Sequence, residues 1–445
     1  MPNRKSGGSG IAVSSSARRL GWGLADQGMS SLSNAALSFY MAHQLGATQF
    51  GAFSIAYVTY SFVLNASRGL ATEPLLVRFS GAELPAWRKA VSRSTGTSVV
   101  VGLAMGVCTL VVDMAMGGTL RLAFLALGLV LPGLMLQDSW RYAFFALGRG
   151  RQSFINDTIW TVAMVPAILV LRLMHLQSVF WFVLLWGATA TLAACIGPLQ
   201  ARVLPKPWRA VEWITHHRDL GPRFLAENTS NAGATQLRAY CIGGIAGLAT
   251  VGDIQAGILL LGPFMVVFMG ISVVTVPEAV RMLHVSVHHL RRYCYLIGCG
   301  LAATCALWGV VLLIVIPHGL GALLLGQELW RPAYHLVIPF TISVMASCFA
   351  DGFQAGLHAL GAARRSLRAM VVSSALYLGL GIVGAYFDGA FGAVCGAAVS
   401  TWVGAALWWV QLHTAMREAG IGAPVHRAVA AQPSAPVQAS TSEAV

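Results

Sequence analysis

The sequence is poor in charged residues. Only 10% of its 445 residues are Asp, Glu, Lys or Arg, whereas 56% are hydrophobic. Soluble globular domains carry about 25% charged residues, so this composition excludes a soluble protein. Apolar runs recur along the chain, and each reaches the roughly 20 residues that a helix needs to cross a hydrocarbon core of about 30 Å. The sequence therefore predicts an all-α polytopic membrane protein.

Cysteine and lysine are also scarce. The eight cysteines are spread through apolar stretches without C-x-x-C spacing, which argues against disulfides and against a zinc site. With three lysines and no G-x-x-x-x-G-K-[ST] loop, the chain is not expected to hydrolyse ATP. His284, His288 and His289 have the spacing of metal ligands, but they lie in a basic connection and predict a solvated face. We therefore expect no enzyme activity, no cofactor and no metal site.

The apolar runs predict twelve transmembrane helices in two pseudo-symmetric six-helix lobes. Their approximate cores are residues 20–44, 52–70, 93–114, 120–147, 153–173, 178–201, 222–247, 252–276, 293–316, 332–360, 367–387 and 390–414. The predicted domains are an N-terminal tail (1–19), an N-lobe (20–201), an interfacial helical linker (202–221), a C-lobe (222–416) and a disordered C-terminal tail (417–445).

Basic residues are distributed unevenly over this topology. With the N-terminus in the cytoplasm, 23 of the 29 Lys and Arg residues fall in the tails and connections on that side, and three fall in the opposite connections. This asymmetry follows the positive-inside rule and predicts that both termini and the 202–221 linker are cytoplasmic. The net charge of +13 thus reports orientation in a membrane. We expect no nucleic-acid partner.

Two of the predicted spans carry the same polar stripe. In the first span Asp26, Ser30, Asn34 and Ser38 recur every four residues, with Gln27 and Ser31 beside them. At an offset of 201 residues the seventh span carries Glu227, Asn228, Asn231 and Thr235 in place of Asp26, Gln27, Ser30 and Asn34. Spacings of three and four residues place such side chains on one helix face. Because lipid does not solvate a carboxylate, this face should line a protein interior or a wet cavity. We expect Asp26 and Glu227 to face one central cavity from opposite lobes.

Further matches extend the repeat. Gly46 and Gly51 correspond to Gly247 and Gly252 at the same offset of 201 residues. In the fourth and tenth spans the offset is 213 residues, and Asp138 corresponds to Asp351 while Ala146-Leu147-Gly148 corresponds to Ala359-Leu360-Gly361. Two copies of a six-helix unit with short loop insertions would produce this pattern.

Ionisable residues within the predicted spans are the remaining candidates for a site. Besides Asp26 and Glu227 they are Arg68, Asp138, Arg141, Asp157, Arg238 and Asp351. Such groups cost roughly 2.5–3.5 kcal/mol at the centre of a membrane and usually serve a pathway or pair with each other. Two structural alternatives remain open. Asp138 and Arg141 would neutralise each other on one helix face, or Arg68 would extend its side chain to the cytoplasmic interface.

Several motifs resemble those of the MOP exporter superfamily. They are the turn from Leu45 to Ala52 before a long apolar span, Arg68-Gly69-Leu70 and Arg78 at the exit of the second span, and Ala146-Leu147-Gly148-Arg149 at the end of the fourth. The resemblance covers residues 18–416 and points to the polysaccharide flippases, which include O-antigen and teichoic-acid exporters. The superfamily also contains lipid II flippases and MATE multidrug antiporters. Membership implies transport by alternating access across the bacterial cytoplasmic membrane.

The sequence departs from the flippase pattern in two respects. It has twelve predicted spans where many flippases have fourteen, and its intramembrane acids and arginines are balanced where glycan flippases favour a cationic cavity. Three functions therefore remain open. The first is a flippase for a lipid-linked oligosaccharide, in which arginines hold the diphosphate and polar side chains meet the sugars. The second is a proton- or sodium-coupled drug antiporter, and the third is a non-transporting scaffold of a glycan assembly complex. The partners implied are a lipid-linked glycan, membrane lipids, and a glycan polymerase or glycosyltransferases.

Overall fold

The computed structural model describes residues 8–314 and 318–421 as an all-helical chain. At some positions inside helices, which include most of residues 8–27 and also Glu227 and Asn231, only the backbone is described. The elements are α1 (Gly8–Gln44), α2 (Ala47–Ser67), η1 (Arg68–Thr72), α3 (Glu73–Phe79), α4 (Leu84–Met114), α5 (Gly118–Ala146), α6 (Gly150–Leu173), α7 (Val179–Ala201), η2 (Pro207–Arg209), α8 (Ala210–His216), α9 (Gly221–Ile245), α10 (Leu248–Val285), α11 (Val287–Ile314), α12 (His318–Ala359) and α13 (Ala363–Ile421).

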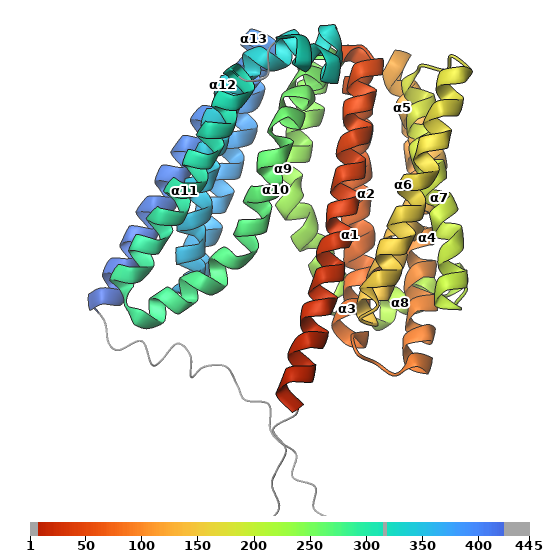
Figure 1. Cartoon of the computed structure of the whole chain (residues 1–445), viewed down its shortest axis with the longest axis horizontal. Helices are drawn as coiled ribbons and strands as arrows, with labels where there is room; N and C mark the ends of the chain where they lie inside the picture. The colour runs from red at the N-terminus through yellow and green to blue at the C-terminus, as the bar shows by residue number, and fades with distance from the viewer. Residues whose placement is uncertain (1–7, 315–317, 422–445) are drawn as a thin grey trace, which may run out of the picture. The chain divides into compact units, whose positions relative to one another are not determined.

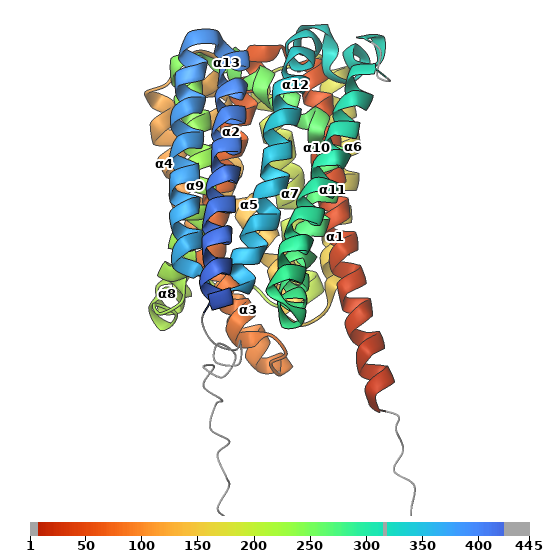
Figure 2. The ribbon, with the colours of Figure 1, turned by 90° about the vertical axis from the view of Figure 1, so that its left-hand side faces the viewer.

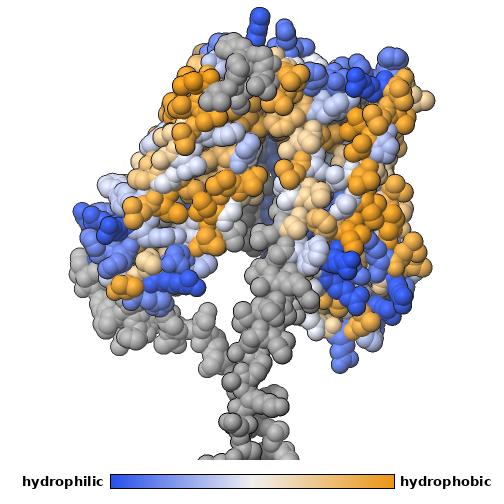
Figure 3. Space-filling model, viewed as in Figure 1, coloured by the Kyte–Doolittle hydropathy of each residue, from blue (hydrophilic) through white to orange (hydrophobic). Residues whose placement is uncertain are grey.

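Eight helices in the described part of the chain are long and apolar enough to cross a membrane, namely α4, α5, α6, α7, α10, α11, α12 and α13. On the face shown in Figure 3, hydrophobic side chains cover the middle of α4–α7 and hydrophilic ones gather at the helix ends. An all-α multi-pass membrane fold is thereby confirmed, but the count of twelve spans is not. Helices α1, α2 and α9 coincide with predicted spans but are not among the eight helices that meet the length and hydropathy criteria in the described part of the chain. Helix α13 joins two predicted spans across a break at Asp388 and Gly389.

The predicted tails differ from the described helices. Helix α1 begins at Gly8, so the described part of the predicted N-terminal tail, residues 8–19, is helical and continuous with the first predicted span. No proline lies between Pro2 and Pro74 to end a helix there. Helix α13 continues to Ile421, and the remainder of the predicted disordered tail, residues 422–445, lies outside the described residues.

The chain divides into two compact units (Figures 1 and 2). The first comprises Met1–Gly262, Gly309–Phe340 and Leu378–Ala397, and the second comprises Pro263–Trp308, Thr341–Tyr377 and Ala398–Val445. In the second unit, segments of α10–α13 pack around buried residues such as Cys294, Phe353 and Leu412. These units do not coincide with the two predicted six-helix lobes, which stay a prediction.

Helices α4–α7 form a bundle within the first unit, as Figure 1 shows. Tryptophans fasten neighbouring helices because a buried indole N–H must find an acceptor. Trp87 of α4 donates to the Ala143 carbonyl of α5 (3.0 Å), and Trp140 of α5 donates to the Ala194 carbonyl of α7 (3.0 Å). Both rings are fully buried. Helix α5 is therefore fixed on two sides, which positions the charged residues near its end.

The linker between α7 and α9 is helical at η2 and α8. Trp208 is 75% exposed, in line with the interfacial location predicted for it, but Trp213 is buried against Phe79 and His217 and does not face outward. The His217 ring nitrogen Nδ1 lies 2.8 Å from the Trp213 carbonyl, and burial lowers the pKa of this imidazole. The linker thus packs into the first unit through an aromatic cluster.

Local backbone geometry supports the predicted repeat at the ends of α5 and α12. Gly148 and Gly361 both have positive φ, 70° and 67°. In each copy the glycine N–H donates to the carbonyl three residues earlier, to Phe145 at 2.9 Å and to His358 at 3.0 Å. Both helices therefore end in the same left-handed glycine turn, which residues with a Cβ rarely adopt.

The repeated glycines Gly51 and Gly252 contact each other's helix end within the first unit. A Cβ on Gly51 would lie 1.7 Å from the Leu248 carbonyl oxygen, and a Cβ on Gly252 would lie 2.2 Å from the Ala47 carbonyl oxygen. The contact is reciprocal, as a pseudo-twofold relation between two copies of one helix would make it. Nearby, Glu328 of α12 accepts a hydrogen bond from the Ala47 N–H (2.9 Å) and caps the positive end of α2.

Candidate functional site

A cavity of about 370 Å³ opens in the first unit between α1, α2, α5 and α6. Its wall combines hydroxyl and amide groups with three aromatic rings and four ionisable side chains. The lining residues are Ser30, Ser31, Asn34, Tyr57, Tyr60, Ser61, Leu64, Arg68, Gln137, Asp138, Arg141, Asp157 and Trp160. The structure therefore brings together six of the candidates named from the sequence, namely Ser30, Asn34, Arg68, Asp138, Arg141 and Asp157.

Arg68 is held at the cavity wall by a two-pronged ion pair. Its Nε and Nη2 donate to the two carboxylate oxygens of Asp138 at 3.0 and 2.7 Å. Arg68 opens the π-helical turn η1, which forms because Pro74 cannot donate the N–H that would continue an α-helix to Leu70. The Tyr142 ring lies 5.2 Å from the guanidinium carbon. Arg68 thus has a protein partner for its charge, while the interfacial alternative stays a prediction.

Arg141 pairs with the stripe residue Asp26. Its Nε donates to the Asp26 carboxylate at 2.6 Å, and the Asp26 side chain is 0% exposed. The predicted neutralisation of Asp138 by Arg141 on one face of α5 is thus wrong. Asp138 instead pairs with Arg68, which follows the end of α2, and Arg141 pairs with Asp26 of α1. Both partners lie on helices other than α5. The two ion pairs join α5 to both of the first helices.

Asp157 of α6 is the third carboxylate of the wall. It accepts a hydrogen bond from the Gln137 amide at 2.6 Å and has no ion pair at 4.0 Å or less in the described part of the chain. The same lining contains the aromatic rings of Tyr57, Tyr60 and Trp160. The wall therefore offers an acid, flat apolar faces and hydrogen-bonding groups within one space.

A second cavity of about 180 Å³ adjoins the first. The two share Asn34 and Tyr57, and the second is lined further by Ala35, Ser38, Phe50, Phe53, Ser54, Gln255 and Leu259. Two residues of the predicted α1 stripe, Asn34 and Ser38, thus face this connected space. Ser30, Asn34 and Ser38 line these two cavities, while Asp26 is fully buried. That the stripe as a whole lines a transport cavity stays a prediction.

Three predicted site residues lie away from this cavity lining. Asn228 of α9 donates to Glu73 at 3.0 Å. Arg238 is buried, donates to the Ala393 carbonyl at 2.9 Å and packs against Gly381. Asp351 belongs to the second unit. Each therefore contributes to other parts of the helical packing in this structure.

Three further predicted residues cannot be placed by their side chains. Gln27, Glu227 and Asn231 lie on the helical backbones of α1 and α9, but their side chains are outside what the structure describes. The expectation that Asp26 and Glu227 face one cavity from two lobes therefore stays a prediction.

Several cavity residues were missed at the level of sequence. The missed residues on α2 are Tyr57, Tyr60, Ser61 and Leu64. Their spacing of three and four residues places them on the helix face of Arg68, and this spacing is the signal that could have identified them. Asp157 was visible as an intramembrane acid, but nothing near it in the sequence identified its partner Gln137. The tyrosines looked like ordinary membrane aromatics because their neighbours come from other helices.

No family model matches the sequence, and no curated protein matches it. Solved structures do match its fold. An inward-facing multidrug resistance transporter of the MATE family, within the MOP superfamily, has a TM-score of 0.66 at 12% identity, covering 89% of this chain and 96% of its own. The lipid II flippase MurJ in an inward closed conformation has a TM-score of 0.62 at 9% identity, covering 90% and 91%. An outward-facing MATE transporter reaches 0.53 at 10% identity, covering 90% and 94%.

These similarities establish the fold of the chain. It is a multi-pass integral membrane protein with the MOP superfamily fold, as its motifs predicted. Drug transporters and a lipid flippase share this fold at nearly equal similarity.

Proposed function

We propose that this protein is a transporter that moves a lipid-linked oligosaccharide across the bacterial cytoplasmic membrane. The observation that carries the proposal is the composition of the cavity wall. Serine, asparagine and glutamine side chains would hydrogen-bond sugar hydroxyls, and the rings of Tyr60 and Trp160 would stack on sugar faces. A cavity for lipophilic drugs would instead be lined predominantly by apolar residues.

The Arg68–Asp138 pair supplies a means of binding the diphosphate that links lipid and sugar. A guanidinium that donates two parallel bonds to a carboxylate has the geometry that also fits phosphate. A diphosphate entering the cavity would compete with Asp138 for the same two N–H groups. The paired acid would keep Arg68 oriented between transport events and release it to the more highly charged ligand.

Alternating access between two six-helix lobes would carry the bound glycan across. In this proposal α1, α2 and α9 also cross the membrane and α13 crosses it twice, which gives twelve spans. Both termini lie in the cytoplasm, as the distribution of basic residues requires. A glycan polymerase or glycosyltransferases would act on either side of the transport step.

The proposal predicts that Arg68→Lys lowers glycan export at least tenfold while protein abundance stays normal. Lysine keeps the charge that neutralises Asp138 but loses the planar fork that binds two phosphate oxygens. Export would be measured as surface glycan in cells that depend on this gene. Arg78→Lys is the matched control, because Arg78 pairs with Asp219 at 2.6 Å on the surface and should retain full export. Full export by the Arg68→Lys variant would contradict the diphosphate role.

Asp157 favours a second candidate function, a cation-coupled drug antiporter. A carboxylate without an ion-pair partner among the described residues, beside the rings of Tyr57, Tyr60 and Trp160, is suited to an organic cation or a coupling proton. In that case Asp157→Asn would abolish drug resistance and leave Arg68→Lys active. If the lipid-linked glycan is the substrate, the Asp157→Asn variant should export it normally.

The proposed orientation is tested by cysteine labelling in intact cells. On a background without the eight native cysteines, Gly117→Cys should react with an impermeant thiol reagent added outside. Gly117 lies between α4 and α5 with open space around it and an extended backbone, so a side chain fits there. Lys206→Cys should react only after the membrane is permeabilised. The reverse pattern would overturn the orientation.

A further inference from the structure

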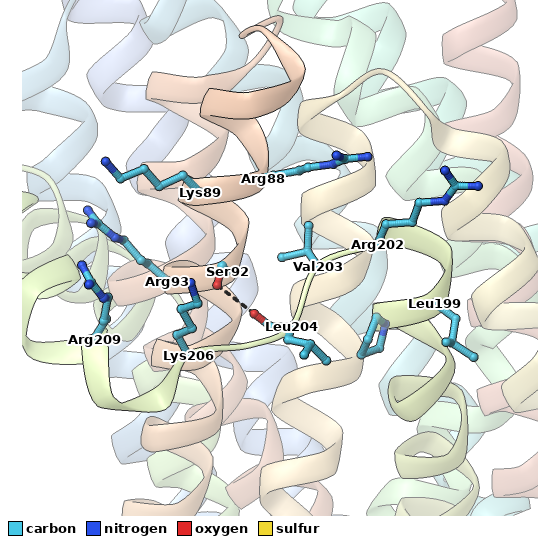
Figure 4. Close-up of a pocket in the computed structure, with 11 residues that line it drawn as sticks. Arg88, Lys89, Ser92, Arg93, Leu199, Arg202, Val203, Leu204, Lys206 and Arg209 are labelled. Atoms are coloured by element: carbon cyan, nitrogen blue, oxygen red, sulfur yellow. Dashed lines mark hydrogen bonds between the residues drawn. The ribbon is translucent and has the colours of Figure 1, made fainter.

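A second, larger groove of about 770 Å³ lies in the first unit, outside the candidate transport cavity. Six basic side chains line it together with Ser92, Pro198, Leu199, Val203 and Leu204. The six are Arg88, Lys89 and Arg93 from α4, and Arg202, Lys206 and Arg209 from the segment after α7. Figure 4 shows these side chains around the segment 202–206.

The segment that carries the second set of basic residues is fastened to α4. The Lys206 N–H donates to the Ser92 carbonyl at 2.8 Å, and the Ser92 hydroxyl donates to the Leu204 carbonyl at 2.7 Å. At Gly96 the Lys206 backbone comes so close that a Cβ would lie 2.4 Å from it. The backbone of the groove is therefore a preformed feature of the fold, and it keeps the two sets of basic residues close to each other.

Few of these cations are neutralised by the protein. Glu212 pairs with Arg93 at 2.8 Å and with Arg209 at 3.0 Å. Within the described part of the chain, Arg88, Lys89, Arg202 and Lys206 have no acidic partner within ion-pair distance, and all four side chains are exposed. Like charges held together repel each other unless an anion lies between them. The groove thus has an excess of positive charge that an external anion would balance.

The position of the groove indicates where that anion comes from. It lies at the first turns of α4 and just after the last turn of α7, and both helices are candidate membrane spans. The end of a spanning helix stands at the level of the lipid headgroups. Exposed apolar side chains flank the cations, since Leu199 is 78% and Leu204 is 72% exposed. An exposed apolar surface next to a cluster of cations suits a molecule with an acyl region and an anionic head.

We infer that this groove binds the phosphate headgroup of an anionic membrane lipid. Guanidinium groups of Arg88 and Arg202 would donate to the phosphate oxygens, and Lys89 and Lys206 would add charge. Leu199 and Leu204 would contact the start of the acyl chains. The site is separate from the proposed transport cavity, so it does not depend on the identity of the transported substrate.

Lipid binding to the purified full-length protein tests the inference. The probe is fluorescent phosphatidylglycerol, titrated into detergent-solubilised protein, with phosphatidylcholine as the neutral comparison. We expect phosphatidylglycerol to bind at least tenfold more tightly than phosphatidylcholine, and Arg88→Gln/Arg202→Gln to weaken phosphatidylglycerol binding at least tenfold. Arg88→Lys/Arg202→Lys should retain intermediate affinity because the charge remains. Equal affinity of the wild type for the two lipids, or an unchanged affinity in the glutamine variant, would overturn the inference.

Two controls make the result specific. Arg364→Gln/Arg368→Gln removes the same charge from exposed positions outside the groove and should leave binding unchanged. A loss as large as that of the groove variant would show a general charge effect and refute the site. Soluble glycerol phosphate should compete poorly with the lipid. Competition at similar concentrations would mean that a soluble phosphate compound, and not a lipid, is the ligand.

Discussion

Replacing Arg141 with glutamine should destabilise the protein by about 3–5 kcal/mol, the range measured when one partner of a buried ion pair is removed. Asp26 is 0% exposed and receives the Arg141 guanidinium at 2.6 Å. Without that guanidinium its charge would remain buried and unmatched. The measurement is thermal unfolding of the purified protein in detergent. We expect a clear fall in the unfolding temperature of Arg141→Gln and substantial recovery in Asp26→Asn/Arg141→Gln, in which the charge is also gone.

The surface pair of Arg78 and Asp219 provides the control. Its oxygen–nitrogen distance is also 2.6 Å, but the two side chains are 35% and 52% exposed. Water and salt screen such a pair, so Arg78→Gln should leave the unfolding temperature unchanged. Two pairs of equal length would then differ only through burial. An Arg141→Gln variant as stable as Arg78→Gln would refute the importance of the buried pair.

Gly51→Ala should also have a large effect, because its added methyl carbon would lie 1.7 Å from the Leu248 carbonyl oxygen. Backbone atoms cannot move aside as a flexible side chain can, so the ends of α2 and α10 must separate. Overpacking of this kind costs about 1–3 kcal/mol. Gly252→Ala should behave alike, since its methyl carbon would lie 2.2 Å from the Ala47 carbonyl oxygen. The unfolding temperature of each variant measures the effect.

The double variant and a matched glycine sharpen this test. Once one methyl group has separated the helix ends, the second should cost less, so Gly51→Ala/Gly252→Ala should lose less stability than the two single losses added. Gly244→Ala on α9 is the control, because nothing lies within 4 Å of its added carbon. That change should be neutral or slightly stabilising, as alanine favours a helix. Equal effects at Gly51 and Gly244 would contradict the close contact.

Hydropathy predicted where most helices lie but not where they end. The apolar run at 93–114 belongs to α4, which starts at Leu84. Its first turns carry Arg88 and Lys89, which an apolar window rejects although they are helical. By contrast, the sequence did mark the break in α13, because the predicted spans 367–387 and 390–414 are separated at Asp388 and Gly389, where the backbone leaves the helical conformation.

The charged residues of the candidate site could be listed from the sequence, but their pairing could not. Asp138 and Arg141 stand three residues apart, and helical spacing alone predicts that they meet each other. Asp138 instead meets Arg68, 70 residues earlier, and Arg141 meets Asp26, 115 residues earlier. Which helix stands beside which depends on packing among buried tryptophans and glycines. A single sequence does not reveal such long-range neighbours.

The two buried ion pairs also form late during synthesis of the chain. Asp26 and Arg68 leave the ribosome before α5, and 115 residues separate Asp26 from Arg141. At about 5–20 residues per second, synthesis of that stretch takes about 6–23 s. Throughout this interval α1 contains an acid that lipid solvates poorly, at a cost of roughly 2.5–3.5 kcal/mol. Asp26 and Arg68 can therefore form these ion pairs only after α5 has been synthesised. Until then we expect the membrane-insertion machinery to keep the two charged side chains away from lipid.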